Sequence, residues 1–156
     1  MWRLIQRVAL MLGGLGIGVV GVLVPLELLL RWHPRPSFEV PPGLVRSHPT
    51  RRYALVPGFR GTVNGHTIQI SEQGIRDRVF SVEKPMGTQR IVCLGDSFTF
   101  GLGVAESDSY PKQLERLLNA QLHGQPAVEV MNFGVPGYNT VYEWHILQEE
   151  VQRYQP

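Results

Sequence analysis

The chain has 156 residues, of which 43% are hydrophobic, and its 15 Lys and Arg against 13 Asp and Glu give a formal net charge of +2. The aliphatic and aromatic content excludes a chain that is disordered throughout. A single cysteine, Cys93, excludes a disulfide-stabilised scaffold. The positive surplus is too small to indicate nucleic acid as a partner. The basic residues cluster in the first third of the chain, around an apolar segment, where anionic lipid headgroups would attract them.

The first predicted element is a membrane helix over residues 8–30, after a short basic flank at residues 1–7. At about 1.5 Å per residue this helix spans about 34 Å, enough for a bilayer core of roughly 30 Å. The alternative is a cleavable signal peptide, which has a shorter apolar region followed by a small-residue cleavage site. Here the segment ends Pro25-Leu-Glu-Leu-Leu-Leu-Arg31-Trp32, without such a site. We therefore expect an uncleaved, single-pass anchor in the lipid bilayer.

Charges and glycines near this helix suggest its orientation and a partner. Arg3 and Arg7 favour an N-inside orientation, although two arginines also follow the helix and weaken the argument. That orientation would place the globular part outside the cytoplasm, in the periplasm or at the cell surface. Gly14 and Gly18 form a G-x-x-x-G pattern, which would allow two such helices to dimerise. Glycines are common in membrane helices, so this pattern alone is weak.

Residues 31–57 contain six prolines and are predicted to link the helix to the rest of the chain. Proline lacks an amide donor and restricts the residue before it, so we expect no regular structure in this segment. It would form either a stiff juxtamembrane stalk or an irregular strap on the domain surface.

Residues 58–88 follow as a lead-in to the main domain, and they contain two notable features. Asn64-Gly65 lies between two β-prone runs, and both residues tolerate the positive φ of a type I′ turn, which predicts a hairpin over 62–70. Asp77 lies between Arg76 and Arg78. We interpret it as part of a solvated ion-pair cluster, the usual role of such a group, and a functional role is the less favoured alternative.

The main domain is predicted over residues 89–156, where two apolar runs, Arg90–Leu94 and Ala127–Met131, are typical of buried strands. Each is followed by a turn rich in small residues. A helix separates the strands, and a strand–helix–strand unit of this length is parallel and right-handed. Both turns would therefore lie at the same edge of the sheet, where ligands bind in open α/β sheets.

Two helices are predicted in this domain. Asp108 or Ser109 caps the first, which ends at Gly124. Thr140 and Glu143 form a capping-box pattern at the start of the second. The first helix has one apolar face and Pro111 in its first turn, and the second continues to the end of the chain. The face of the first is made of Leu114, Leu117, Leu118 and Leu122, and the second runs on through Trp144, Leu147 and Val151.

The turn after the first strand contains a serine, Ser97. A hydroxyl at a strand end, opposite a second turn with free backbone amides, is what acyl transfer needs: a nucleophile and fixed N–H donors for the oxyanion. The alternative is that the glycines only form tight turns, and the spacing leaves both interpretations open. A phosphate-binding loop is disfavoured, because the lysine that should follow its last glycine is absent.

The motif Gly95-Asp96-Ser97-Phe98-Thr99-Phe100-Gly101 resembles the first signature block of the SGNH, or GDSL, hydrolases. Asn132-Phe-Gly134-Val-Pro-Gly137-Tyr-Asn139-Thr140 is similar to their second block. The segment 73–77 resembles the lead-in of membrane-anchored bacterial members. The resemblance implies an α/β fold of the three-layer, flavodoxin-like SGNH type with a parallel sheet.

The resemblance also implies an activity, the hydrolysis of ester bonds by an esterase, a lipase or a carbohydrate O-acetyl esterase. It makes Ser97 the nucleophile and Asp96 the residue that holds the turn in shape. It makes the backbone amides of Ser97 and Gly137 the donors of an oxyanion hole. The substrate would be an ester or an acetylated carbohydrate, and no metal or organic cofactor is implied.

The family's remaining blocks, Gly-x-Asn-Asp and Asp-x-x-His, do not occur in these 156 residues. None of the histidines has an aspartate three positions earlier, so we expect each to be a surface or packing residue. They are His33, His48, His66, His123 and His145. We therefore expect the first half of a hydrolase domain, inactive alone. Two alternatives remain: a non-catalytic membrane-anchored binding or assembly module of the same fold, and a polysaccharide O-acetyltransferase.

Overall fold

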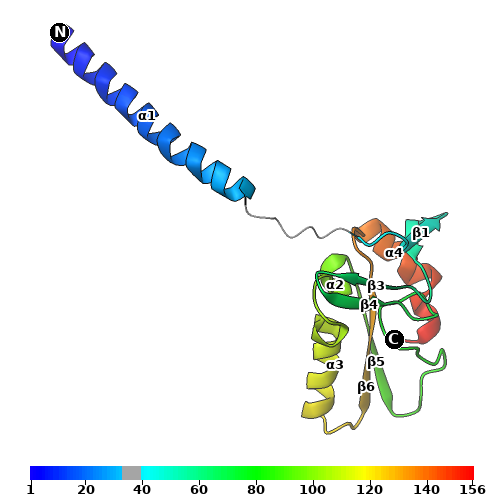
Figure 1. The fold of residues 1–156 in the computed structure, drawn as a ribbon. Coiled ribbons are helices and arrows are strands. Elements are labelled where there is room, and N and C mark those ends of the chain that lie inside the picture. The colour runs from blue at the N-terminus through cyan, green and yellow to red at the C-terminus, as the bar shows by residue number, and fades with distance from the viewer. Residues whose placement is uncertain (33–39) are drawn as a thin grey trace. The chain divides into compact units, whose positions relative to one another are not determined.

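The computed structural model describes residues 1–32 and 40–156. They form two compact units, a single N-terminal helix and a globular unit that begins after it (Figure 1). Residues 33–39 of the predicted linker, His33 among them, lie outside the described residues, whereas its first two residues belong to the helix α1.

The N-terminal unit is one long apolar helix, α1 (Trp2–Trp32). Its segment Ile5–Trp32 is long and apolar enough to cross a membrane, with a mean hydropathy of 2.3 over its most apolar window, none of which is buried against protein. A membrane anchor and a signal sequence share these properties. Glu27 accepts a hydrogen bond from Arg31 Nε at 2.7 Å, one turn later, so the charge inside the apolar segment is paired.

The globular unit begins with two antiparallel hairpins, β1–β2 over residues 45–55 and β3–β4 over residues 60–69. The β3–β4 hairpin, which the sequence predicted, pairs β3 (Arg60–Val63) with β4 (His66–Gln69). Asn64 and Gly65 between these strands have φ of 49° and 79°, which confirms the predicted hairpin and its turn.

The first hairpin pairs β1 (Val45–His48) with β2 (Arg52–Leu55). The expectation that residues 31–57 lack regular structure is therefore wrong for this stretch. The prolines do not interrupt its ladder, because Pro41, Pro42 and Pro57 lie outside the strands and Pro49 lies in the turn.

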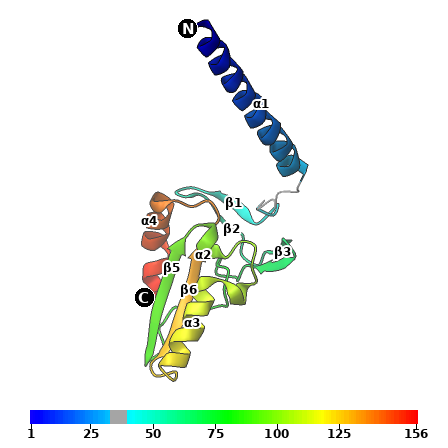
Figure 2. The same cartoon turned by 90° about the vertical axis from the view of Figure 1, so that its left-hand side faces the viewer.

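The centre of the unit is a parallel pair of strands, β5 (Thr88–Gly95) and β6 (Ala127–Gly134), with Gly95 opposite Gly134. The predicted parallel pairing is confirmed, and both strands run further than expected, as far as their glycines. Helix α3 (Tyr110–Gln121) lies on one side of the pair, and α4 (Thr140–Glu149) lies on the other (Figure 2).

Alternate side chains of these strands face the two sides, as a period of two requires. One side carries a small cluster of Cys93, Val128 and Val130 against Leu114 and Leu118 of α3. The other side joins the main core.

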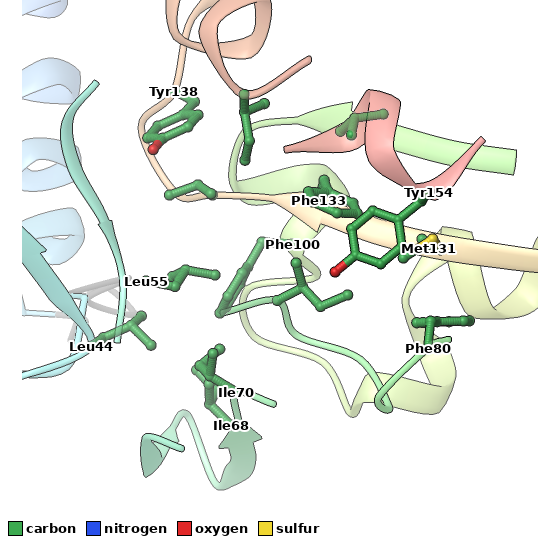
Figure 3. Close-up of a cluster of buried hydrophobic side chains, with 14 of the residues drawn as sticks. Leu44, Leu55, Ile68, Ile70, Phe80, Phe100, Met131, Phe133, Tyr138 and Tyr154 are labelled. Atoms are coloured by element: carbon green, nitrogen blue, oxygen red, sulfur yellow. The ribbon is translucent and has the colours of Figure 1, made fainter. Parts of the chain in front are cut away.

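The main core draws residues from both hairpins, the two central strands, the one-turn helix α2 (Ser97–Phe100), α4 and the short 3₁₀ helix η2 (Val151–Tyr154) (Figure 3). Phe100, fully buried, lies between Leu55 and Ile70 of the hairpin region and Phe133 of β6. A two-stranded parallel sheet alone has too few neighbours to bury both faces. Here the hairpin region, α4 and η2 bury the second face.

The helix boundaries correct several details of the prediction. Ser109, not Asp108, precedes α3, because Asp108 lies in the short 3₁₀ helix η1 (Glu106–Asp108). Leu117 is 55% exposed and does not belong to the buried face, because the narrow sheet covers only a stripe of α3. The capping box is also wrong: Asn139 caps α4, and its Oδ1 accepts from the amides of the second and third helical residues at 3.1 Å each. The last helix ends at Glu149, before η2.

Candidate active site at the carboxyl end of the parallel strands

Ser97 lies at the first position of a one-turn helix, α2 (Ser97–Phe100), directly after β5. Asp96 is the N-cap, and its Oδ1 accepts from the amide of Phe98 at 2.9 Å. Gly101 ends the turn in the left-handed conformation, with φ of 79°, and its N–H donates to the Ser97 carbonyl at 3.0 Å. Ser97 is half-buried, and as an N1 residue its own N–H has no intrahelical acceptor.

Two glycines allow α2 to lie directly against the strand ends. A Cβ on Gly134 would stand 2.1 Å from the amide nitrogen of Phe100, and one on Gly95 would stand 2.0 Å from Thr99 Oγ1. Neither glycine has a positive φ. Their absent side chains therefore serve the close packing of the serine helix on β6, rather than the conformation of a turn.

The second turn follows β6 at the same edge of the sheet. Val135 N–H donates to the Gly95 carbonyl at 3.0 Å, and Tyr138 N–H donates to the Val135 carbonyl at 3.1 Å. Between them lie Pro136, which is buried, and Gly137, which is exposed and has φ of 79°. Within residues 1–32 and 40–156, neither Gly137 N–H nor Ser97 N–H donates a hydrogen bond.

Behind the serine turn lies Arg76, whose side chain is fully buried. Its Nη1 donates to the carbonyls of Phe100, at 3.0 Å, and Gly101, and its Nη2 donates to the Val104 carbonyl at 2.8 Å. The guanidinium carbon also lies 5.0 Å from the centroid of the Phe100 ring. Burial lowers the pKa of Arg76, which Glu106 partly opposes. Arg76 thus binds carbonyls at the end of the serine turn and in the segment that follows it.

Asp77 connects the same lead-in to the second turn. Its carboxylate accepts from Asn132 N–H at 3.1 Å and from Lys112 Nζ at 2.7 Å. Asn132 Oδ1 in turn accepts from Gly134 N–H at 3.0 Å. Burial raises the pKa of Asp77, while Lys112 and the backbone donors lower it.

The interpretation of Asp77 as part of a solvated ion-pair cluster is therefore wrong. Asp77 and Arg76 are buried, and only Arg78 is half-exposed, where it pairs with Glu115 at 2.7 Å. Three charged residues in a row do not show which of them will be buried. Their one distinguishing signal is that the first two end the segment that resembles the lead-in of membrane-anchored hydrolases.

Tyr53 is a residue at the site that sequence reasoning missed, because it lies in the segment expected to be irregular. Its hydroxyl donates to the Pro136 carbonyl at 2.8 Å, and Tyr138 Oη donates to the Tyr53 carbonyl at 2.6 Å. The two rings lie 5.5 Å apart. Burial raises the pKa of Tyr53 and raises that of Tyr138 to about 12, so both hydroxyls remain protonated donors near neutral pH.

The histidines in the described part of the chain are not bonded to the serine. His145 Nδ1 lies 3.9 Å from Glu149 Oε1, and His48 contacts Arg51. Ser97 Oγ has no hydrogen-bonding partner among the described residues. A polar cavity of about 90 Å³ lies between the β1–β2 hairpin and α4, but Ser97 does not line it.

Comparison with known families bears on this edge of the sheet. Residues 93–156 match the sequence model of the GDSL-like Lipase/Acylhydrolase family. No curated protein matches the chain. The matched residues contain both turns, whereas Tyr53, Arg76 and Asp77 lie before them.

Proposed function

We propose that the chain is an ester hydrolase of the GDSL type in which Ser97 is the nucleophile. The observation that carries this proposal is the parallel register of β5 and β6, which brings the serine turn and the Gly137 turn to one edge of the sheet. In each turn one backbone N–H donates no hydrogen bond to the described residues. The family match over residues 93–156 supports the same chemistry. The parallel β5–β6 pair with helices on both sides is consistent with the three-layer fold of these hydrolases, which we propose for the globular unit.

In the proposed reaction, Ser97 Oγ attacks the ester carbonyl and expels the alcohol, which leaves an acyl-enzyme that water cleaves. The amides of Ser97 and Gly137 would stabilise the negative charge on the carbonyl oxygen in the tetrahedral intermediate. Gly137 lacks a side chain and is exposed, so an ester oxygen can approach its N–H. Asp96 would keep the serine at the helix start.

A neutral serine hydroxyl is a poor nucleophile until a base accepts its proton. General-base assistance is worth about 10²–10⁴-fold in rate. Ser97 Oγ has no such partner in the described residues, so we expect the 156-residue chain to react slowly by itself. A base supplied from solution should then accelerate the reaction.

The proposal is tested by labelling Ser97 in the full chain, purified in detergent, with a fluorophosphonate probe at increasing imidazole concentrations. Imidazole stands in for the base. We expect slow labelling without imidazole and a rate that rises with its concentration, with the label located on Ser97 by mass spectrometry. Ser97→Ala should abolish labelling, and Ser81→Ala, at an exposed loop serine, should not change it.

Two other outcomes have distinct meanings. If Ser97 were never labelled at any imidazole concentration, the hydrolase proposal would be wrong, and a non-catalytic binding or assembly module would be favoured. If labelling were fast without imidazole and were lost in Ser97→Ala, the expectation of an inactive chain would be wrong, and His145 would be the first residue to replace. An O-acetyltransferase would instead be recognised by transfer of the acetyl group to a polysaccharide in place of water.

We also propose that α1 is an uncleaved anchor and that the globular unit lies outside the cytoplasm, with the bilayer as a partner. The length and hydropathy of Ile5–Trp32 support insertion. Protease added to intact cells should digest the globular unit, and the purified protein should retain Trp2 in its N-terminal sequence. Loss of the first residues from the mature protein would identify a signal sequence instead.

A further inference from the structure

We propose that Tyr53, in the hairpin before the matched residues, is a positioning residue for the second oxyanion donor: its hydroxyl holds the Pro136–Gly137 peptide in one of two turn conformations. The inference rests on the proposed function, which assigns Gly137 N–H to the oxyanion hole.

The turn after β6 is a four-residue β-turn. The Tyr138 N–H bond to the Val135 carbonyl, at 3.1 Å, closes a β-turn with Pro136 and Gly137 at its centre. Gly137 has φ of 79°, the value of the third residue in a type II turn. Types I and II differ mainly by a flip of the central peptide. Proline and glycine tolerate both, so local sequence alone does not choose between them.

The central peptide carries the proposed donor. The Pro136 carbonyl and Gly137 N–H belong to one planar unit and point in opposite directions. A bond that fixes the carbonyl therefore fixes the direction of the N–H. Tyr53 Oη donates to that carbonyl at 2.8 Å, which stabilises the type II state. A flip would break this bond and turn Gly137 N–H away from its present direction.

Tyr53 is itself held in place by contacts on both sides. Tyr138 Oη donates back to the Tyr53 carbonyl at 2.6 Å, so two reciprocal bonds join β2 to the turn. Arg51, whose side chain is 2% exposed, pairs with Glu149 at 3.4 Å and with Glu150. These ion pairs join the same hairpin to the end of α4. The hairpin is thus a firm support for the turn, and Tyr53 is the side chain through which it acts.

The peptide flip is measurable whether or not Ser97 reacts. The chain contains three Pro-Gly bonds, Pro42–Gly43, Pro57–Gly58 and Pro136–Gly137. Labelling the full chain with carbonyl-¹³C proline and ¹⁵N glycine therefore yields three cross-peaks in a carbonyl–amide correlation spectrum, two of which are internal references.

In Tyr53→Phe, we expect an upfield shift of the Pro136 carbonyl resonance, because it loses a hydrogen bond. The order parameter of Gly137 N–H should fall below the rigid value of about 0.85, or its peak should broaden by exchange. The two reference peaks should not move. Tyr142→Phe is the matched control: Tyr142 packs on Tyr138 at 5.5 Å, and its hydroxyl has no hydrogen-bonding partner among the described residues.

The functional consequence is measured with the imidazole-assisted labelling of Ser97. Removal of one oxyanion donor costs about 10²–10³-fold in rate, which is the upper limit for a donor that is only misdirected. We expect Tyr53→Phe to slow labelling by about 10-fold to 100-fold, within that limit. Tyr142→Phe should not slow it. A merely structural role for Tyr53 would leave the rate unchanged at temperatures where both proteins are folded.

The NMR signals and the labelling rate together distinguish failure of the positioning role from failure of the proposed function. Unchanged Pro136 and Gly137 signals in Tyr53→Phe would overturn the positioning role, whatever Ser97 does. Altered signals with an unchanged labelling rate would show that the peptide is held but does not serve the reaction, which also overturns the inference. No labelling of Ser97 in the unmodified chain would overturn the proposed function, and with it the catalytic meaning of the bond.

Discussion

The serine turn and the Gly137 turn lie at the same sheet edge, yet different parts of the chain hold them. Asp96 and Gly101, inside the serine motif, cap and end α2, and Arg76 binds the carbonyls behind it. The Gly137 turn instead depends on Tyr53, 83 residues earlier than the carbonyl that it contacts. The first turn is recognisable as a local motif because most of its supports are local. The second has the same small residues, but its conformation depends on a distant hairpin.

The largest effect should come from Arg76, the buried support of the serine turn. Arg76→Met removes the charge but keeps the length of the side chain. It removes the charged donor from the carbonyls of Phe100, Gly101 and Val104. Among the described residues, the Gly101 carbonyl then keeps only the Val104 amide, at 3.3 Å, and the Phe100 carbonyl keeps only the Asn132 side-chain amide, at 3.5 Å. We expect the free energy of unfolding to fall by about 3–5 kcal/mol. Denaturant unfolding followed by near-ultraviolet circular dichroism measures it.

The neighbouring Arg78→Met is the matched control. Its half-exposed ion pair with Glu115 should contribute no more than about 1 kcal/mol. If both substitutions lowered the free energy of unfolding equally, Arg76 would not support the serine turn as its contacts indicate.

The next effect tests the Gly137 turn. Gly137 and Gly65 both have φ of 79°, but a Cβ on Gly137 would stand 2.6 Å from Tyr53 Oη, whereas one on Gly65 has nothing within 4 Å. We expect Gly65→Ala to lower the free energy of unfolding by about 1–2 kcal/mol, because alanine is strained at a positive φ. Gly137→Ala should lower it by about 1–3 kcal/mol more, because the added Cβ also clashes with Tyr53.

A double-mutant cycle isolates that difference. Tyr53→Phe removes the atom that would clash, so it should recover part of the cost of Gly137→Ala and have no effect on that of Gly65→Ala. Additive costs of Tyr53→Phe and Gly137→Ala would contradict the close contact between the hairpin and the turn.

A smaller effect compares the helix caps that follow each turn. Asn139 Oδ1 accepts two amides of α4, and Asp96 Oδ1 accepts one amide of α2. Each alanine variant should lower the free energy of unfolding by about 0.5–2 kcal/mol, with Asn139→Ala the more costly. Thr140→Ala should change it by less than about 0.5 kcal/mol, because Thr140 is not the cap. If Thr140→Ala lowered the free energy of unfolding more than Asn139→Ala, the capping-box prediction would be correct after all.

The smallest effect concerns two carboxylates that both bind Lys112, at 2.7 Å for Asp77 and 3.2 Å for Glu115. Burial raises the pKa of Asp77 above 3.8. Burial also acts to raise the pKa of Glu115, but the Val130 amide, Arg78 and Lys112 outweigh it and bring that pKa below 4.5.

Opposite pH dependences follow from these shifts. Folded Asp77 retains its proton to higher pH than the unfolded chain does, so its contribution to stability falls as pH rises above about 3.8. Folded Glu115 loses its proton at lower pH, so its contribution falls as pH drops below about 4.5. Unfolding free energies of Asp77→Asn and Glu115→Gln, each subtracted from the unmodified protein between pH 3 and 7, should have opposite slopes. Slopes of the same sign would show that Lys112 dominates at both carboxylates.

The amino-acid sequence alone was enough to predict the features that depend on near neighbours along the chain. The short apolar runs at Arg90–Leu94 and Ala127–Met131 indicated β5 and β6, and the length of the connection indicated their parallel pairing. Asn64-Gly65 indicated the β3–β4 hairpin, because the positive φ that it needs is a property of these two residues. The apolar helix and the position of Ser97 after a strand followed in the same way.

The residues that support the two turns could be identified only from the folded globular unit. A buried guanidinium is stable where several carbonyls converge on it. Three of the carbonyls that Arg76 binds come from residues 24 to 28 positions later in the chain, and a fourth, that of Thr67, comes from nine positions earlier. Tyr53 contacts the Gly137 turn because β1 and β2 pair in a segment whose prolines had led us to expect no strand. Leu117 fits the apolar pattern of α3 but is exposed, because the sheet beneath the helix has two strands. Local patterns record the preferences of a segment, whereas burial and hydrogen bonding depend on what distant segments bring to it.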